Sequence, residues 1–239
     1  MKLSVILPCY NERDNLVELF KRLDLLEKSG LELEIVLVNN GSTDDSASIF
    51  DAELNKRPGT CMRVHTVEKN LGYGYGILSG LKAATGELLA VTHADRQTDP
   101  MDVVKAYQLF LERPNENLLV KGYRKNRKAT EAIFSFGMGL LASLALGTRL
   151  TEINAQPKLF TKRFFDGVKD KAPYDFSLDL YFLYQAKKKG AIIDFPVYFA
   201  KRVAGEAKGG SGSSWQTRWK LIKRSFNYIF ELKQQLGKH

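Results

Sequence analysis

The stretch LEIVLVNNGSTDDS, residues 33–46, changes from an apolar run to polar residues within a few positions. Residues 33–38 are rich in leucine and β-branched side chains, which is typical of a buried strand. Ser42 and Thr43 are residues that commonly begin a helix. This one stretch therefore predicts a strand, a polar turn and a helix in succession.

The same succession recurs on both sides of this stretch. The predicted strands are residues 3–8, 62–67, 87–92 and 117–122, and the predicted helices are residues 14–29, 75–84 and a segment after Pro100. Strands that alternate with helices at this spacing predict an α/β fold, in which helices cover both faces of a mostly parallel sheet. Ligands bind such sheets at the carboxyl ends of the strands.

The composition is that of a folded protein, with 239 residues of which 44% are hydrophobic. We expect one continuous domain over residues 1–200, a glycine-rich loop over residues 201–214 and a C-terminal helix over residues 215–239. Cys9 and Cys61 form no CxxC pattern and the histidines are not clustered, so neither a disulfide framework nor a structural zinc site is indicated. This cysteine usage favours a cytoplasmic protein.

No segment is predicted to cross a membrane. The longest uncharged stretch, residues 132–148, has 17 residues and contains three glycines, which places it at the lower limit for spanning a bilayer. The formal charge of +9 suits nucleic acid, anionic lipid or phosphorylated ligands, but many basic proteins have none of these partners. Because no nucleic-acid motif is present, we expect no nucleic-acid partner.

Groups of mostly polar residues stand at the ends of three of the predicted strands. They are Pro8, Tyr10, Asn11 and Glu12 after the first strand, Asn39 and Asn40 after the second, and His93, Ala94, Asp95 and Gln97 after the fourth. The carboxyl ends of parallel strands meet at one edge of a sheet, so we expect these three groups to converge. The glycines of residues 72–80 either admit a ligand to the backbone or only form a tight turn and pack a helix.

These motifs resemble, in order and spacing, the family-2 inverting glycosyltransferases of GT-A fold. The resemblance is carried by SVILPCYNERDNL, IVLVNNGSTDDS, EKNLGYGYGILSGL, TGELLAVTHADRQTDP and KRVAGEAK, and it covers residues 3–208. The branch that the chain resembles most includes dolichyl-phosphate mannose synthase and related polyprenyl-phosphate sugar transferases. The resemblance implies that a hexose moves from a nucleotide sugar to a polyprenyl phosphate or, as second choice, to a cell-surface glycan.

The resemblance also implies a nucleotide site at the ends of the first two strands. Its residues would be Pro8, Tyr10, Glu12, Asn39 and Asn40, where the last two replace aspartates that are usual in the family. An asparagine both donates and accepts hydrogen bonds, so a different base preference is one interpretation of the change. The other interpretation is that both asparagines stabilise the turn before Ser42.

A Mg²⁺ or Mn²⁺ site on the donor's diphosphate is implied after the fourth strand. Asp95 occupies the position of the family's metal carboxylate, with Ala94 and Gln97 beside it, whereas His93 stands where a second carboxylate is usual. His93 either ligates the cation through nitrogen, which suits Mn²⁺ better than Mg²⁺, or bonds the donor's phosphate or ribose. If donor binding is weakened instead, the alternative function is a nucleotide-sugar binding protein with weak or no turnover.

Further site residues are implied in the second half of the chain. Arg124 is the candidate for facing a phosphate, and Arg202 and Lys208 match basic positions of a loop suited to clamping a diphosphate. Glu152 and the following NAQPK depart from the family's usual pattern, which leaves the acceptor open.

Asp179 is the candidate general base, at the first turn of a helix predicted over residues 176–190. In family members with hydroxyl acceptors, an acidic residue near this position deprotonates the attacking oxygen. Asp175 is the second candidate. Asp179 could instead only favour the start of the helix through the helix dipole. A lipid phosphate is already ionised, so with that acceptor no base is needed and Asp179 would position groups.

The C-terminal segment has the pattern of an amphipathic helix. Its apolar stripe consists of Trp215, Trp219, Ile222, Phe226, Ile229 and Leu236, with lysines and arginines on the flanks. Such a helix suits an anionic membrane surface, and packing of the stripe against the domain is equally compatible with the sequence. Residues 132–148 are a candidate second interfacial element. We therefore expect peripheral contact with the inner face of the membrane.

Overall fold

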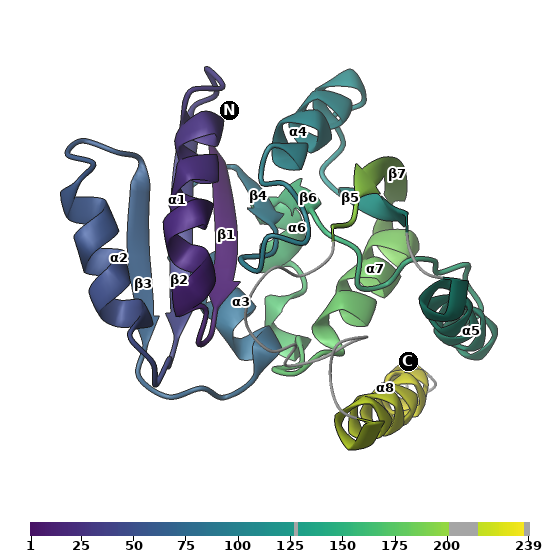
Figure 1. Ribbon diagram of the computed structural model, residues 1–239. Helices are drawn as coiled ribbons and strands as arrows, with labels where there is room; N and C mark the ends of the chain where they lie inside the picture. The colour runs from purple at the N-terminus through teal and green to yellow at the C-terminus, as the bar shows by residue number, and fades with distance from the viewer. Residues whose placement is uncertain (127–128, 201–214, 237–239) are drawn as a thin grey trace.

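The computed structural model describes residues 1–126, 129–200 and 215–236. A seven-stranded sheet in the order β3-β2-β1-β4-β6-β5-β7 runs through the molecule (Figure 1). Its strands are β1 (Leu3–Cys9), β2 (Leu33–Asn40), β3 (Met62–Val67), β4 (Leu88–Val91), β5 (Leu118–Lys125), β6 (Lys158–Thr161) and β7 (Ala191–Tyr198). β6 runs antiparallel to its neighbours β4 and β5, and the other strand pairs are parallel. The predicted mostly parallel sheet is confirmed.

Helices cover both faces of this sheet (Figure 1). They are α1 (Arg13–Glu27), α2 (Ser46–Asn55), α3 (Tyr73–Ala83), α4 (Asp102–Glu112), α5 (Ala129–Leu146), α6 (Lys162–Asp166), α7 (Leu178–Lys189) and α8 (Trp215–Leu236), with a 3-10 turn over Lys169–Lys171. Apolar side chains of α1, α2 and α4 form one core with the sheet, and those of α3, α6, α7 and α8 form the other. The alternating direction of strand side chains supplies both cores.

The C-terminal helix α8 packs against the domain. Tyr228, Ile229 and Leu232 are buried in the same core as α7, and α8 contacts α5. Of the predicted stripe, Ile229 is buried and Phe226 is partly buried, while the side chains of Trp215, Trp219, Ile222 and Leu236 lie outside the described ones. Within the described ranges, no helix combines the length and the apolar character needed to cross a bilayer.

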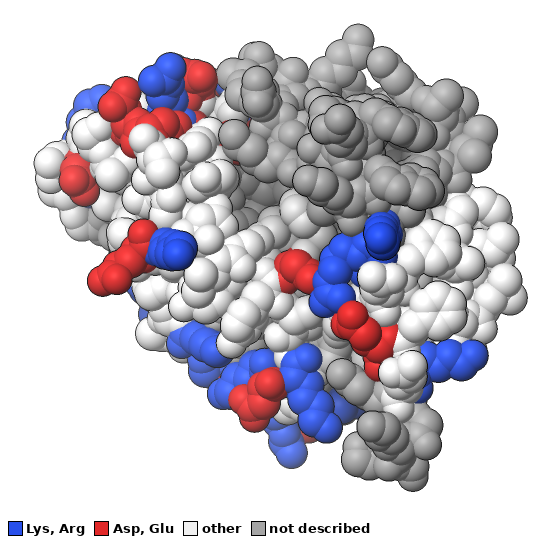
Figure 2. All heavy atoms as spheres, turned by 90° about the horizontal axis from the view of Figure 1, so that it is seen from below, with Lys and Arg blue, Asp and Glu red and all other residues white. Residues whose placement is uncertain are grey.

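Charged side chains of both signs share the described surface. On the face shown in Figure 2, lysines and arginines are interspersed with aspartates and glutamates and form no continuous basic stripe among the described residues.

Glu34 organises the amino ends of the strands, at the edge opposite the polar clusters. Its carboxylate accepts hydrogen bonds from the hydroxyl of Ser4, from the backbone N–H and hydroxyl of Thr85, and from the guanidinium of Arg63. Burial raises the pKa of Glu34, but these hydrogen bonds outweigh burial and lower the pKa to about 2. The network ties β1, β2, β3 and the segment before β4 together.

Replacing Glu34 with alanine is expected to lower the free energy of unfolding by about 2–3 kcal/mol near pH 7, because several donors lose their acceptor. The native pKa lies below the ordinary value of 4.5, so the stabilisation is fully present above that pH and is lost as the pH falls toward 2. Urea unfolding at a series of pH values measures both effects. Glu32→Ala, at an exposed neighbouring position, is the control, and equal losses in the two variants would contradict the prediction.

Candidate active site

The ends of β1 and β2 are tied to each other by the first residues of α1 and α2. The carboxylate of Glu12, which is 9% exposed, accepts from Asn15 Nδ2 at 2.6 Å. The backbone N–H of Glu12 donates to Ser46 Oγ at 3.2 Å. Asn11 Oδ1 accepts from the backbone N–H of Thr43 at 2.8 Å. These contacts hold the predicted nucleotide-binding edge in a fixed shape, with Pro8 and Tyr10 partly exposed beside it.

The two asparagines that end β2 are both engaged within the protein. Asn39 Oδ1 accepts from the backbone N–H of Ser42 at 3.1 Å, which is the turn-stabilising role. Asn40 Nδ2 donates to the carbonyl of Gly72 at 3.1 Å. Gly76 permits this approach, because a Cβ there would lie 2.7 Å from the Asn40 amide. Asn40 therefore anchors the start of α3 to the strand end.

The loop after β4 holds the predicted cation ligands. The Asp95 side chain is 8% exposed, and its Oδ1 accepts from the backbone N–H of Gln97 at 3.1 Å, which brings these two residues to one turn. Burial lowers the pKa of His93, while the charges of Asp95 and Asp179 act in the opposite direction. The net effect lowers the pKa of His93 below its ordinary value, which favours the neutral imidazole, a form with one nitrogen able to accept. The Ala94 side chain is buried in the core of α1 and α4.

A buried ion pair lies beside this loop. Lys158, at the start of β6, is 1% exposed, and its Nζ donates to Asp179 Oδ1 at 2.6 Å and to the carbonyl of Ala155 at 2.9 Å. Asp179, in the first turn of α7, is 3% exposed. Gln156 Nε2 donates to the same Oδ1 at 3.2 Å, and the Tyr73 hydroxyl donates to Oδ2 at 3.3 Å. Both oxygens of Asp179 therefore have donors.

The charged groups of the loop and of the ion pair affect one another. Burial lowers the pKa of Lys158, Asp179 opposes this shift, and Arg124 adds to it. The charges of Lys158 and Arg124 also lower the pKa of His93. Coulomb interactions weaken with distance, so the charges that act on His93, those of Asp95, Asp179, Lys158 and Arg124, lie in its neighbourhood and are treated together as one cluster. The structure thus brings the predicted cation loop, the predicted base and the predicted phosphate-facing arginine together.

Two predicted residues have ion-pair partners beside this cluster. Arg124 Nε donates to Glu152 Oε2 at 2.8 Å, and its guanidinium lies 5.4 Å from the centre of the Phe199 ring. Asp175, the second candidate for the base, pairs with Arg224 of α8. Burial raises the pKa of Asp175, but hydrogen bonds from Arg224 and from Ser177 lower it further than burial raises it. The predicted Arg202 and Lys208 lie outside the described residues.

Comparison with known proteins identifies the family. Residues 4–167 match Glycosyl transferase family 2. The chain belongs to this family. A dolichol-phosphate mannosyltransferase from Pyrococcus furiosus is 30% identical over 216 residues, which cover 87% of this chain and 59% of that protein. An undecaprenyl-phosphate 4-deoxy-4-formamido-L-arabinose transferase from Enterobacter sp. (strain 638) is 33% identical over 131 residues, which cover 54% of this chain and 38% of that protein.

This family-2 chain thus spans less than two thirds of the length of these relatives. Among solved structures, it is similar to glucosyl-3-phosphoglycerate synthase from Mycobacterium tuberculosis, crystallised with Mn²⁺, UDP-glucose and phosphoglyceric acid. The TM-score is 0.75 and the identity is 16%, and the match covers 98% of this chain and 80% of that chain. At this identity the likeness concerns the fold, and it confirms the GT-A architecture expected from the sequence.

The residues after β4 fit a cation only together with a bound diphosphate. Asp95 would offer one carboxylate, Gln97 one amide oxygen and His93 one ring nitrogen to a cation. In the described part of this family-2 chain, no group of three His, Cys, Asp or Glu side chains is arranged to hold a metal ion. A cation would therefore take its remaining ligands from phosphate oxygens and water.

Three side chains around Asp179 were not predicted from the sequence. They are Lys158, Gln156 and Tyr73, and the Tyr73 ring stacks on Phe176 with centroids 4.6 Å apart and planes inclined by 4°. For Lys158, the sequence did contain a signal of a buried charge, because this lysine is followed directly by the apolar residues Leu159 and Phe160. A charge at the start of so short an apolar run needs a partner if the run is buried.

Proposed function

We propose that this family-2 chain transfers a hexose from a nucleotide sugar, with inversion, to a polyprenyl phosphate. The observation that carries the proposal is the single cluster of Asp95, His93, Asp179, Lys158 and Arg124 at the ligand-binding edge of a GT-A sheet. The names of the two curated relatives, which specify undecaprenyl phosphate and dolichol phosphate, support this class of acceptor.

The hydrogen bonds of Asp179 favour an acceptor that needs no base. Lys158 and Gln156 donate to one of its oxygens and Tyr73 donates to the other. Taking a proton from an acceptor hydroxyl would neutralise Asp179 and leave the buried Lys158 ammonium without its counter-charge. A phosphate acceptor is already an anion at neutral pH, so Asp179 can keep its partners and position Lys158 and Tyr73. A hydroxyl acceptor on a glycan remains the second choice.

The residues of the cluster and those around it then have distinct roles. Asp95 and Gln97 would hold Mg²⁺ or Mn²⁺, with His93 as a further ligand or as a donor to phosphate. When bound, the cation supplies positive charge to the diphosphate that leaves with the nucleoside. Glu12, Asn39 and Asn40 shape the nucleotide-binding edge of the sheet, while Pro8 and Tyr10 are exposed enough to contact the nucleoside. Arg124, Arg202 and Lys208 are the proposed phosphate-facing cations.

The function is tested by incubating the whole chain with uridine and guanosine diphosphate hexoses and Mn²⁺, with and without a short-chain polyprenyl phosphate. We expect release of nucleoside diphosphate, formation of a glycolipid and loss of both on chelation of the metal. Donor binding without release would support the alternative, a nucleotide-sugar binding protein. Stimulation by a glycan instead of the lipid phosphate would support the second acceptor.

The helix α5 supports peripheral contact with a membrane. Phe136, Leu140 and Leu144 follow one another at intervals of four and are 70%, 50% and 75% exposed, so they form one apolar stripe. Figure 1 shows α5 and its neighbour α8 at one end of the molecule. We propose that the stripe lies in the lipid headgroup region, close to where a polyprenyl phosphate would be met.

Replacing Leu140 and Leu144 together with serine is expected to weaken binding to anionic liposomes by at least about tenfold, since each buried leucine contributes about 1.5–3 kcal/mol. Co-sedimentation with vesicles measures the change. Leu25 on α1 and Leu111 on α4 are 50% and 48% exposed and provide the matched double-serine control. Unchanged binding of the α5 variant would remove this helix from the membrane contact.

A further inference from the structure

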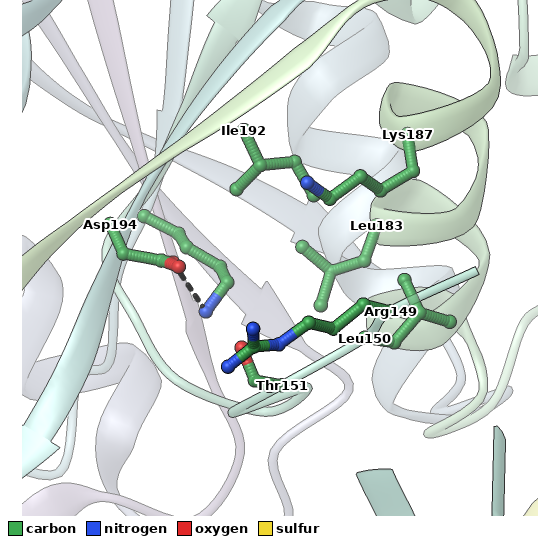
Figure 3. A pocket seen from close by; sticks show the side chains of 8 residues that line it. Arg149, Leu150, Thr151, Leu183, Lys187, Ile192 and Asp194 are labelled. Carbon is green, nitrogen blue, oxygen red and sulfur yellow. Dashed lines mark ion pairs between the residues drawn. The ribbon is translucent and has the colours of Figure 1, made fainter. Parts of the chain in front are cut away.

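A polar cavity lies on the α7 face of the sheet. It has a volume of about 240 Å³ and is bounded by β5, β7, α7 and the segment that follows α5 (Figure 3). Its charged lining consists of Lys121, Arg149, Lys187 and Asp194. Figure 3 shows Arg149 and Lys187 reaching toward the cavity from different parts of the chain. Three cations face one carboxylate, so the cavity carries an excess of two positive charges.

Lys121 is the buried member of this set. It is 1% exposed, and its Nζ lies 2.7 Å from Asp194 Oδ1 on the neighbouring strand. The ammonium carries three N–H groups. Yet Nζ makes no well-directed hydrogen bond within the described part of the chain, including to this carboxylate. Beside its ion pair with Asp194, this buried ammonium therefore has N–H groups to spare, and an anion in the cavity would accept from them.

A second buried lysine increases the need for an anion. Lys121 on β5 is the register partner of Lys158 on β6, and both are 1% exposed. The charge of Lys121 acts on Lys158 in the direction that disfavours its ammonium form. Two like charges on paired strands repel, and each has a single carboxylate partner, Asp194 for Lys121 and Asp179 for Lys158. A negative group beside Lys121 would reduce this repulsion.

The remaining walls of the cavity are largely apolar. Leu150, Leu183 and Ile192 line it together with the Thr151 hydroxyl. A ligand that fits these walls has an anionic group for the cations and an apolar portion next to it. A phosphate monoester is dianionic, matches the charge excess and accepts several hydrogen bonds at once.

We propose that this cavity is a phosphate-binding site, separate from the donor site, which takes a phosphate group attached to an apolar substituent. The group can belong to a small phosphate ester or to a phospholipid headgroup. Arg149 follows the end of α5 by three positions, and Leu144 of the exposed stripe is five positions before it. The inference does not depend on sugar transfer, because none of the lining residues belongs to the proposed donor cluster.

Calorimetric titration of the whole chain with inorganic phosphate and with phenyl phosphate, at constant ionic strength in chloride, tests the proposal. We expect saturable binding of both probes, with phenyl phosphate bound more tightly because its ring meets the apolar walls. Arg149→Gln combined with Lys187→Gln is expected to weaken binding at least about tenfold. Lys82→Gln combined with Lys188→Gln removes the same charge at exposed positions outside the cavity and should leave binding unchanged.

Vesicles separate the two sources of the phosphate group. Co-sedimentation with phosphatidic acid vesicles, compared with phosphatidylcholine vesicles, should fall in the Arg149/Lys187 variant if the site takes a headgroup, and should not change if it takes a soluble ester. Lys121→Met should abolish binding of phenyl phosphate, and if it does not fold, the Arg149/Lys187 variant decides. The proposal would be overturned if neither the calorimetric titrations nor the vesicle experiments showed binding. It would also be overturned if the Lys82/Lys188 control lost as much phosphate binding as the Arg149/Lys187 variant.

Discussion

Asp95→Asn is expected to lower the rate of nucleoside diphosphate release by about 10²- to 10³-fold, the size of effect seen when one group that stabilises transition-state charge is removed. Asparagine keeps an oxygen that can accept from the backbone N–H of Gln97, so the turn after β4 should survive. What it removes is the negative charge that we expect to hold the cation. When Mn²⁺ is added over a range of concentrations, the rate of nucleoside diphosphate release should also increase less in the variant than in the unaltered protein.

Asp99→Asn is the matched control for this change. Asp99 lies four positions further along the same loop and accepts from the backbone N–H of Met101 at 3.0 Å, so the two aspartates make the same kind of turn. It belongs to none of the contacts around Asp179. We expect the control to retain release within about twofold, since exposed substitutions usually have small effects. Full activity of Asp95→Asn, in a variant with unaltered urea unfolding, would exclude Asp95 from the mechanism.

Lys158→Met is expected to lower the free energy of unfolding by about 3–5 kcal/mol, because it leaves the Asp179 carboxylate buried without its ion-pair partner. Methionine has a similar length, so the loss reports the charge more than a cavity. Adding Asp179→Asn should recover much of the loss, since the amide carries no charge. Its single oxygen keeps an acceptor for Gln156, and its NH2 group can donate to the Tyr73 hydroxyl, which is able to accept.

Urea unfolding of the two single variants and the double variant gives the coupling energy between the two residues. Lys188→Met on the exposed side of α7 is the control and should change stability by less than about 0.5 kcal/mol. Additive losses in the double variant would mean that the 2.6 Å contact between Lys158 and Asp179 contributes little to folding.

Four of the first five strands could be predicted because each contains an apolar run, and β3 because apolar residues recur among its polar ones. β6 and β7 could not be predicted in the same way. β6 has four residues and begins with Lys158, and its antiparallel place between β4 and β5 depends on pairing with strands distant in sequence. β7 contains Asp194 and Pro196 and lies at the edge of the sheet, where proline and charge are tolerated.

The site, like the fold, could be predicted only in part. The rule that parallel strands end at one edge was enough to group Asp95 and His93 with the ends of β1 and β2. The role of Asn39 as a turn acceptor was one of two interpretations, and the contact with Ser42 supports it. The pairing of Lys158 with Asp179 was beyond reach, because it joins a strand and a helix through a buried contact that no local pattern encodes.

The pairing of Arg224 with Asp175 means that the last helix is connected to the proposed site. Asp175 directly precedes Phe176, whose ring stacks on Tyr73, and the Tyr73 hydroxyl donates to Asp179. A chain shortened after residue 214 would lose this guanidinium and also the buried side chains of Tyr228, Ile229 and Leu232. Truncation is therefore unsuited to measuring lipid attachment, because it would also destabilise the protein's core.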